Sequence, residues 1–249
     1  MQTSNISQKG SIYEVRFANI AQPFVFQRYT TPEQLGRSYA LTLDNKVTRL
    51  YTSASFLDPS NIDLLRTLLP NVEYLYKPSY ANAMGTQSER QLQQLRSYIP
   101  FLVKLYPSGS LTPKLLSRSF SKLHLSEPRG EGLKLTSTEP GKIIIVAGGT
   151  GLYPFSDLID LLFKSSIVSS DPQTQSSILA ISPILGQHPF GHFSFHLLLA
   201  VHSLEDIHPI TLNQIIHLCK KTTTFRLTLR VSEVSTLFRE KNPFINFTH

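Results

Sequence analysis

The chain has 249 residues, of which 41% are hydrophobic and 16% charged, and its formal net charge is +7. This length accommodates two modest domains or one large one, and the positive charge favours anionic partners such as nucleotide phosphates, acidic proteins, anionic lipids or nucleic acid. The single cysteine, Cys219, excludes an internal disulfide and a four-cysteine metal site. The sequence shows no secretory signal and no apolar run of about 18 residues, which indicates a soluble or peripheral protein, cytoplasmic or mitochondrial rather than secreted.

Short strands are predicted for most of the first half. Runs of β-branched and aromatic residues occupy 12–17, 24–29, 38–43 and 47–52, with the turn residues Asp44 and Asn45 between the last two. Closely spaced strands of this kind are typical of a barrel or a sandwich. Residues 57–100 interrupt the pattern with helix-like segments at 62–69 and 88–99 and a polar loop at 77–87, which we interpret as an insertion. A further strand is predicted at 101–106.

The second half alternates between strand-like and helix-like segments. Residues 143–147 form a continuous apolar run, which is expected of a strand buried on both faces. Helical spacing follows at 154–164 and 209–221, and further strands are predicted at 176–185, 196–201 and 225–231. This alternation predicts a parallel α/β layer. We therefore expect an α+β protein of two domains, residues 1–139 and 140–249, with a boundary near 136–141.

Three short motifs carry candidate chemistry. Residues 49–55 read Arg-Leu-Tyr-Thr-Ser-Ala-Ser and place a cation, an aromatic ring and hydroxyls in one strand. A bound flavin nucleotide needs such a set: a plane to pack against, a donor for the ring edge and charge for its pyrophosphate. Glycine turns at 109–112 and 148–154 offer backbone N–H groups to phosphate, and the second turn precedes a predicted helix. Taken singly, the turn at 148–154 is equally compatible with a turn that binds nothing, and the turn at 109–112 is better interpreted as an ordinary surface turn.

The order and spacing of these motifs, together with the segments 127–133 and 143–154, resemble the ferredoxin reductase superfamily, most closely its cytochrome b5 reductase-like branch. The resemblance implies an antiparallel β-barrel flavin domain with a helical insertion at about 57–100, followed by an α/β parallel-sheet nicotinamide-nucleotide domain. It also implies a FAD-dependent oxidoreductase. Such an enzyme passes electrons from NADH or NADPH to a one-electron acceptor, a haem or iron–sulfur protein.

The same resemblance assigns roles to individual residues. Arg49 would hold the FAD pyrophosphate, Tyr51 would pack on the isoalloxazine, and Thr52 would hydrogen-bond near the reactive ring nitrogen. Tyr51 and Thr52 are therefore the candidate catalytic residues. The expected cofactor-binding residues come from the 49–55 motif, from the strand before the first glycine turn and from both glycine turns. They are Arg49, Tyr51, Thr52, Ser55, Lys104, Tyr106, Gly109, Leu111, Thr112, Gly148, Gly149, Thr150, Gly151 and Pro154.

The sequence departs from the family pattern after residues 225–231. Family members continue to another strand with a Cys-Gly motif that positions the nicotinamide, whereas Cys219 lies within a predicted helix. We therefore expect an α/β domain that is incomplete at its C-terminus, which bears on hydride transfer more than on flavin binding. One alternative is a catalytically reduced accessory or structural subunit of a larger redox assembly, for example a respiratory or membrane assembly. Another is a basic binding module without a cofactor.

Metal and nucleic acid are not expected as ligands. His188, His192 and His196 have a spacing that suits a metal site on one helix face, but Pro189 and Gly191 favour loop and strand instead. The scattered basic and aromatic residues match no known nucleic-acid-binding module. The expected partners are thus an electron-acceptor protein or the subunits of a redox complex, without a transmembrane segment and with peripheral membrane association left open.

Overall fold

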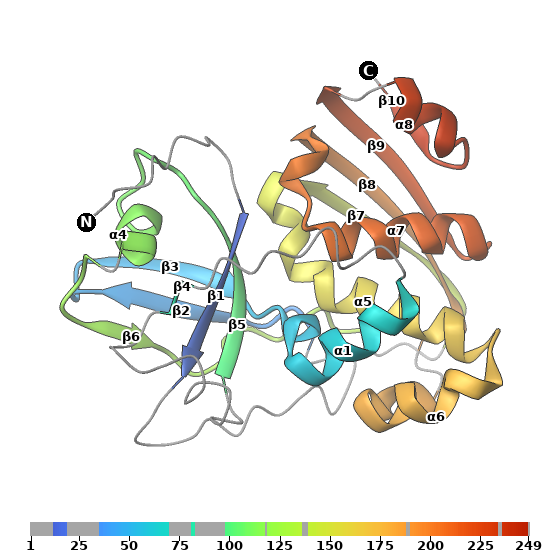
Figure 1. Ribbon diagram of the computed structural model, residues 1–249, viewed down its shortest axis with the longest axis horizontal. Coiled ribbons are helices and arrows are strands. Elements are labelled where there is room, and N and C mark those ends of the chain that lie inside the picture. The colour runs from blue at the N-terminus through green and yellow to red at the C-terminus, as the bar shows by residue number, and fades with distance from the viewer. Residues whose placement is uncertain are drawn as a thin grey trace.

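The computed structural model describes residues 12–18, 35–69, 81–82, 98–117, 119–135, 139–187, 190–233 and 236–248. One half of the molecule contains antiparallel strands, and the other contains a parallel sheet with helices packed on it (Figure 1). The predicted succession of an antiparallel unit and a parallel α/β unit is therefore confirmed. The strand predicted at 24–29 lies outside the described residues, as does most of the helix predicted at 88–99.

The antiparallel half consists of two three-stranded sheets. The first, in the order β4-β1-β5, contains β1 (Ile12–Ala18), β4 (Ala81–Asn82) and β5 (Tyr98–Lys104). The second, in the order β3-β2-β6, contains β2 (Ser38–Leu43), β3 (Val47–Thr52) and β6 (Leu123–Leu125). A bridge between Ser53 and Phe101 links the two sheets. The expected barrel is not closed by the strands that the structure describes.

Tertiary pairing overrides two local predictions in this half. β5 begins at Tyr98, where the sequence predicts the end of a helix, and it ends at Lys104 rather than at 106. β4 lies inside the predicted polar loop at 77–87. Both strands pair with β1, and the β1–β5 ladder runs antiparallel along the full length of β1. Ladder hydrogen bonds and cross-strand packing decide such segments more than intrinsic propensity does.

The β2–β3 hairpin is fixed by its turn. Asp44 and Asn45 have positive φ angles of 51° and 57°, which short polar side chains tolerate better than other non-glycine residues. The carboxylate of Asp44 also accepts hydrogen bonds from the backbone N–H groups of Ser121 and Lys122 at 2.8 and 2.9 Å. The turn therefore sets the hairpin register and attaches the chain that leads into β6.

The parallel half is a four-stranded sheet in the order β10-β9-β8-β7. Its strands are β7 (Gly141–Gly148), β8 (Phe193–Ser203), β9 (Phe225–Glu233) and β10 (Asn246–Thr248). The helices of this half are α5 (Ser156–Val168), α6 (Pro172–Ile181), α7 (Pro209–Lys221) and α8 (Thr236–Lys241). Short 3-10 turns follow three of the strands or helices: η3 (Gly149–Phe155), η4 (Pro183–Gln187) and η5 (Leu204–Asp206).

The strand predicted at 176–185 is wrong, because this segment forms α6 and η4. Asp171 caps α6 by accepting a hydrogen bond from the N–H of Gln173 at 3.0 Å, and Pro172 occupies the first turn, where its missing N–H is not needed. Ile178 is buried in the core from one helix face. The capping residues outweigh the β-branched composition that suggested a strand.

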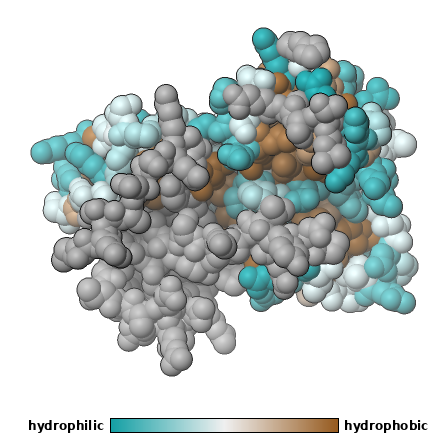
Figure 2. Space-filling model, turned by 45° about the horizontal axis from the view of Figure 1, so that its top comes forward, coloured by the Kyte–Doolittle hydropathy of each residue, from teal (hydrophilic) through white to brown (hydrophobic). Residues whose placement is uncertain are grey.

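β7 lies at an edge of the sheet and is buried on one face only. Ile145 and Ala147 point into the core, while Ile144 and Val146 are 58% and 73% exposed. The expectation of a strand buried on both faces is therefore wrong. The helices α5 and α7 lie on the same side of the sheet in Figure 1, and the opposite face of β7 is left open. In the view of Figure 2, apolar surface gathers over the parallel half of the molecule.

A helix of the predicted insertion connects the two halves. The chain leaves β3 through η2 (Ser55–Leu57) and enters α1 (Pro59–Leu68), which lies beside α5 and α6 in Figure 1. Ile62 and Leu65 of α1 are buried in the same core cluster as Ile159 and Phe163 of α5. The antiparallel half therefore contributes a helix to the hydrophobic core of the parallel half. In the antiparallel half, α4 (Thr112–Ser117) packs on a separate, smaller cluster.

We expect Gly36→Ala to lower the free energy of unfolding more than Gly130→Ala does. Both glycines have positive φ angles, 76° and 82°, so each alanine costs about 1–2 kcal/mol of backbone strain. A Cβ at Gly36 would additionally lie 3.0 Å from the Leu133 side chain and 3.3 Å from the Pro154 carbonyl, whereas one at Gly130 meets no atom within 4 Å. Urea unfolding measures the difference, and equal losses would contradict the close contact at Gly36.

Candidate cofactor site

The three sequence motifs meet at one cavity of about 380 Å³ between the two halves of the molecule. The antiparallel half contributes β3, β5 and the turn at 106–112, and the parallel half contributes η3. The lining residues are Arg49, Leu50, Tyr51, Thr52, Leu102, Lys104, Tyr106, Gly109, Ser110, Leu111, Thr112, Thr150, Tyr153 and Pro154. Ten residues of the predicted cofactor-binding set are therefore brought together.

β3 and Tyr106, two residues beyond the end of β5, give the cavity an apolar and aromatic wall. Leu50 and Tyr106 are 63% and 50% exposed, which is unusual for side chains of their size. The Tyr51 ring packs edge-to-face on the buried Phe101, with 6.4 Å between centroids and 73° between planes. Burial raises the pKa of Tyr51 to about 12, so the phenol stays protonated at neutral pH. This wall presents a fixed neutral ring and a hydroxyl donor.

The turn after β5 presents backbone groups and a hydroxyl to the cavity. The N–H of Gly109 donates to the Tyr106 carbonyl at 2.7 Å, and the N–H of Tyr106 donates to Thr112 Oγ1 at 3.2 Å. A Cβ at Gly109 would lie 3.0 Å from the Tyr106 carbonyl oxygen, so a side chain there would crowd this tight turn. Arg49 faces the same cavity and is exposed; its Nη1 donates to the Thr48 carbonyl at 2.8 Å.

The glycine loop after β7 differs from the predicted strand–helix turn. A seven-residue 3-10 segment, η3, follows β7, and the α-helix begins at Ser156 rather than at Pro154. Thr150 and Pro154 line the cavity, and Gly149 has a positive φ of 52°. A Cβ at Gly149 or Gly151 would meet no atom within 4 Å, so the backbone there is open to close approach. Gly148, Gly149 and Gly151 adjoin the cavity without lining it.

Lys104 lines the cavity, but its charge is already compensated. Its Nζ lies 2.5 Å from Oδ1 of Asp206, and both side chains are largely buried. Burial alone would raise the pKa of Asp206, but the hydrogen bond and charge of Lys104, together with backbone hydrogen bonds from Ser203 and His202, lower it below its usual value. The pair joins β5 to η5 and so fixes the two walls of the cavity. The exposed cation of the cavity is therefore Arg49.

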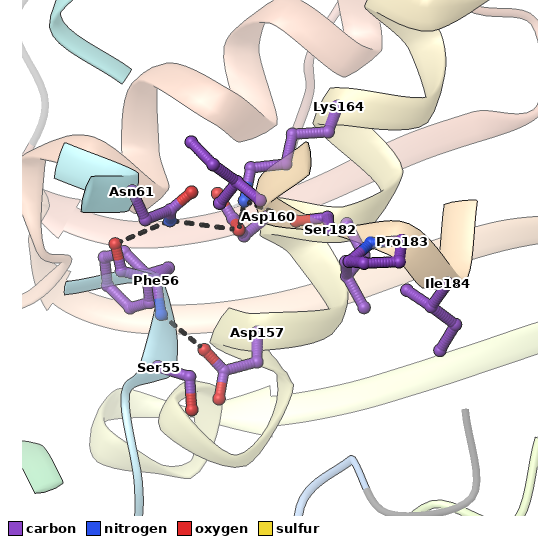
Figure 3. Close-up of a pocket in the computed structure, with 11 residues that line it drawn as sticks. Ser55, Phe56, Asn61, Asp157, Asp160, Lys164, Ser182, Pro183 and Ile184 are labelled. Carbon is purple, nitrogen blue, oxygen red and sulfur yellow. Dashed lines mark hydrogen bonds and ion pairs between the residues drawn. The ribbon is translucent and has the colours of Figure 1, made fainter. Parts of the chain in front are cut away.

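Ser55 lies outside this cavity, in a separate buried polar cluster with Asp157, Asp160 and Lys164 (Figure 3). Its N–H and that of Phe56 both donate to the carboxylate of Asp157, the latter at 2.9 Å. Asn61 Nδ2 donates to the Phe56 carbonyl at 2.7 Å and approaches Asp160 Oδ2 at 3.4 Å. These hydrogen bonds connect η2 and α1, which follow β3, to α5 of the parallel half.

Asp160 is the most fully bonded member of this cluster. Lys164 Nζ lies 2.5 Å from its Oδ2, and Gln214 Nε2 donates to its Oδ1 at 2.7 Å. Lys164 also approaches Ser182 Oγ at 3.2 Å. A cavity of about 40 Å³ lies among these groups, and Asp157 Oδ2 and Asn61 Oδ1 have no protein partner. A polar cavity of this size holds one or two ordered waters rather than a ligand.

Asp157 and His208 are buried groups whose charged forms are disfavoured. Burial raises the pKa of Asp157 to about 8, against hydrogen bonds from Phe56 and Ser55 that lower it, and Asp160 adds to the rise. Burial lowers the pKa of His208 to about 4. The His208 ring packs edge-to-face on Phe56, with 5.6 Å between centroids. Both residues are therefore neutral in the folded protein near pH 7.

We expect stability to fall by about 1–2 kcal/mol between pH 6.5 and 8, because native Asp157 keeps a proton that the unfolded chain has lost. The pKa is raised in the fold, so the stabilisation is present below the unfolded value and disappears as pH rises through 8. His208 has an opposite dependence, but only below its unfolded pKa of about 6.5. Asp157→Asn should reduce this loss of stability with rising pH, which thermal denaturation at a series of pH values measures. An unchanged slope of stability against pH would contradict the raised pKa of Asp157.

Four lining residues and one ion-pair partner were not predicted. Leu102 stands two positions before Lys104 on β5, so strand alternation would have placed it on the same face. Leu50, Ser110 and Tyr153 lie within the three motifs, and this position is the only sequence feature that could have indicated that they line the cavity. Asp206 carries no local signal, since only the fold brings it to Lys104. The hydroxyl of Tyr153 is buried and has no hydrogen-bond partner among the described residues.

Comparison by sequence finds no match: no family profile and no curated protein aligns with the chain. Comparison by structure finds the CS-b5R domains of human Ncb5or in the NAD+ form, at 16% identity and a TM-score of 0.44, covering 83% of this chain and 48% of that chain. It also finds ferredoxin-NADP+ reductase from Plasmodium falciparum with 2'P-AMP, at 12% identity and 0.47, covering 95% and 74%.

A third similar structure is the flavohemoglobin from Malassezia yamatoensis with bound FAD and heme, at 10% identity and a TM-score of 0.40, covering 96% of this chain and 56% of that one. The chain thus spans about half the length of the Ncb5or domains and of the flavohemoglobin.

The described part of the chain contains neither a cluster of metal ligands nor a helix that could span a membrane. No three His, Cys, Asp or Glu side chains lie close enough together there to hold a metal ion. His196 lies on β8 with its Nε2 2.9 Å from Thr228 Oγ1, and His188 is outside the described residues. Among the described helices, none combines the length and the apolar character that crossing a bilayer requires.

Proposed function

We propose that the chain is a flavoprotein of the reductase type, which binds FAD in the cavity between its halves and accepts electrons from NADH or NADPH. The observation that carries this proposal is the convergence of Arg49, Tyr51 and Thr52 with the turn at 109–112 and the η3 loop around one cavity. The three motifs are far apart in the sequence, and each has a tight turn or exposed wall with no evident structural need.

The donor set of the cavity fits a flavin nucleotide. The exposed apolar surface of Leu50 and Tyr106 and the ring of Tyr51 suit a planar aromatic system, and the hydroxyl of Thr52 suits its polar edge. The Arg49 guanidinium and the backbone of the Gly109 turn suit a pyrophosphate. Lys104 would act on the site through Asp206 rather than by holding phosphate.

The nicotinamide nucleotide would approach from the parallel half. Thr150 lines the cavity, and the open backbone at Gly149 and Gly151 admits close approach of a ligand. When bound, FAD supplies the conversion of a two-electron hydride into single electrons for an acceptor such as a haem protein. The residues of the chain bind and orient the two nucleotides and exclude water between them.

Arg49→Ala should weaken FAD binding by about 10- to 150-fold, since a charge-assisted hydrogen bond is worth about 1.5–3 kcal/mol. Lys46→Ala is the matched control, because Lys46 is an exposed cation in the adjoining β2–β3 turn and does not line the cavity. Quenching of flavin fluorescence on titration gives the dissociation constants. Equal affinities for both variants would contradict a pyrophosphate at Arg49.

The deciding experiment is the visible absorption spectrum of the purified protein with FAD, before and after anaerobic addition of NADH or NADPH. We expect bound-flavin bands that bleach with one of the two nucleotides. Flavin bands that persist would leave a flavoprotein without its own hydride donor, the expected property of a catalytically reduced accessory subunit. Absence of bound flavin would overturn the proposal.

The accessory-subunit alternative draws support from a separate observation. The exposure of Ile144 and Val146 leaves one face of the parallel sheet open. An open apolar face of this kind is expected in a chain that functions in contact with another protein. Both functions are compatible with bound flavin, so the reduction experiment separates them.

A further inference from the structure

The four strongly exposed large apolar side chains of the described residues lie in two places. Leu50 and Tyr106 line the cofactor cavity, where the proposed flavin would cover them. Ile144 and Val146 lie on β7, outside the cavity. The proposed function therefore explains the first pair and leaves the second pair without a role.

Ile144 and Val146 belong to a continuous surface, because neighbouring strands are in register. Ile144 lies beside His196 of β8, and Val146 lies beside Leu198. Val146 is the most exposed of the four, and Leu198 is half-buried. Side chains alternate along each strand, so these residues share the face opposite the helix-covered core. Both faces of a parallel sheet are normally covered by other elements.

The same face carries positive charge and no described carboxylate. Lys142 of β7 and Arg226 and Arg230 of β9 are exposed there, and none of them forms an ion pair with another described residue. We define the open face by the residues that strand register and alternation place on it: Lys142, Ile144, Val146, His196, Leu198, Arg226, Thr228 and Arg230. An apolar strip on β7 and β8 is thus bordered by cations.

We propose that the open face binds an acidic amphipathic helix of a partner protein. The apolar stripe of that helix would lie on Ile144, Val146 and Leu198, and its acidic flank would face Arg226 and Arg230. An α-helix with its side chains is about 10 Å wide, and two strand spacings are about 10 Å, so one helix covers the face from β7 to β9. The net charge of +7 disfavours a second copy of this chain and favours an acidic occupant.

The probe is a synthetic helical peptide of about five turns with a leucine stripe, glutamate flanks and one tryptophan. The chain contains no tryptophan, so the fluorescence of the peptide reports its binding to the full chain directly. A second peptide has lysine in place of every glutamate. We expect the acidic peptide to bind at least about tenfold more tightly than the basic one, and its affinity to fall as salt rises.

Two variants locate the binding. Ile144→Asp should abolish binding of the acidic peptide, and Arg226→Glu combined with Arg230→Glu should reverse the preference toward the basic peptide. Lys46→Glu is a charge-reversal control in the distant β2–β3 turn and should leave binding unchanged. Every substituted side chain is exposed, so the fold is retained, and the circular dichroism spectrum checks it.

Equal binding of the two peptides, no binding of either, or binding that survives Ile144→Asp would overturn the proposal. A dimer in analytical ultracentrifugation that Ile144→Asp dissociates would also overturn it, because a second copy would then occupy the face. FAD binding by the same samples is an independent readout. If the wild-type protein does not bind FAD, that result counts against the cofactor site and not against the open face.

Discussion

The cavity depends on a buried polar joint between the two halves of the chain. Asp157 at the start of α5 accepts the N–H groups that follow β3, while Asn61 of α1 bonds across to the same region. Buried polar groups are costly to separate from their partners, so these hydrogen bonds resist movement of one half against the other. The strand that carries Arg49 to Thr52 is therefore held at a fixed position relative to the glycine loop that precedes α5.

A second contact between the two halves lies at the cavity itself. The Lys104–Asp206 pair joins β5 to η5, and Lys104 lines the cavity. A flavin site of this kind needs two surfaces at a set separation, because the reacting rings must lie in van der Waals contact. The hydrophobic core shared by α1 and α5 also stabilises this arrangement, through apolar burial that has no preferred direction. Polar and apolar contacts therefore both hold the two surfaces of the cavity in place.

Much of this arrangement was predictable from the sequence, and the misses have identifiable causes. Alternation and turn residues located β2, β3 and β9, and helical spacing located α1 and α7, because those segments obey local rules. The segment 176–185 was assigned to a strand because Asp171 and Pro172 were not recognised as the start of a helix. β5 was shifted by its pairing with β1, which no local pattern encodes. At the site, the motif residues were predictable, whereas Asp206 depends on tertiary proximity alone.

The order of strand pairing has a consequence for how the chain folds. β8 and β9 are joined through the short η5 and α7, whereas β7 and β8 are separated by η3, α5, α6 and η4. β1 pairs with β5 across nearly the whole antiparallel half. Closing a longer segment costs more chain entropy before any contact repays it. We therefore expect the β8–α7–β9 unit to assemble first, β7 to join it later, and the β1–β5 ladder to close last, so that the cavity exists only once folding is complete.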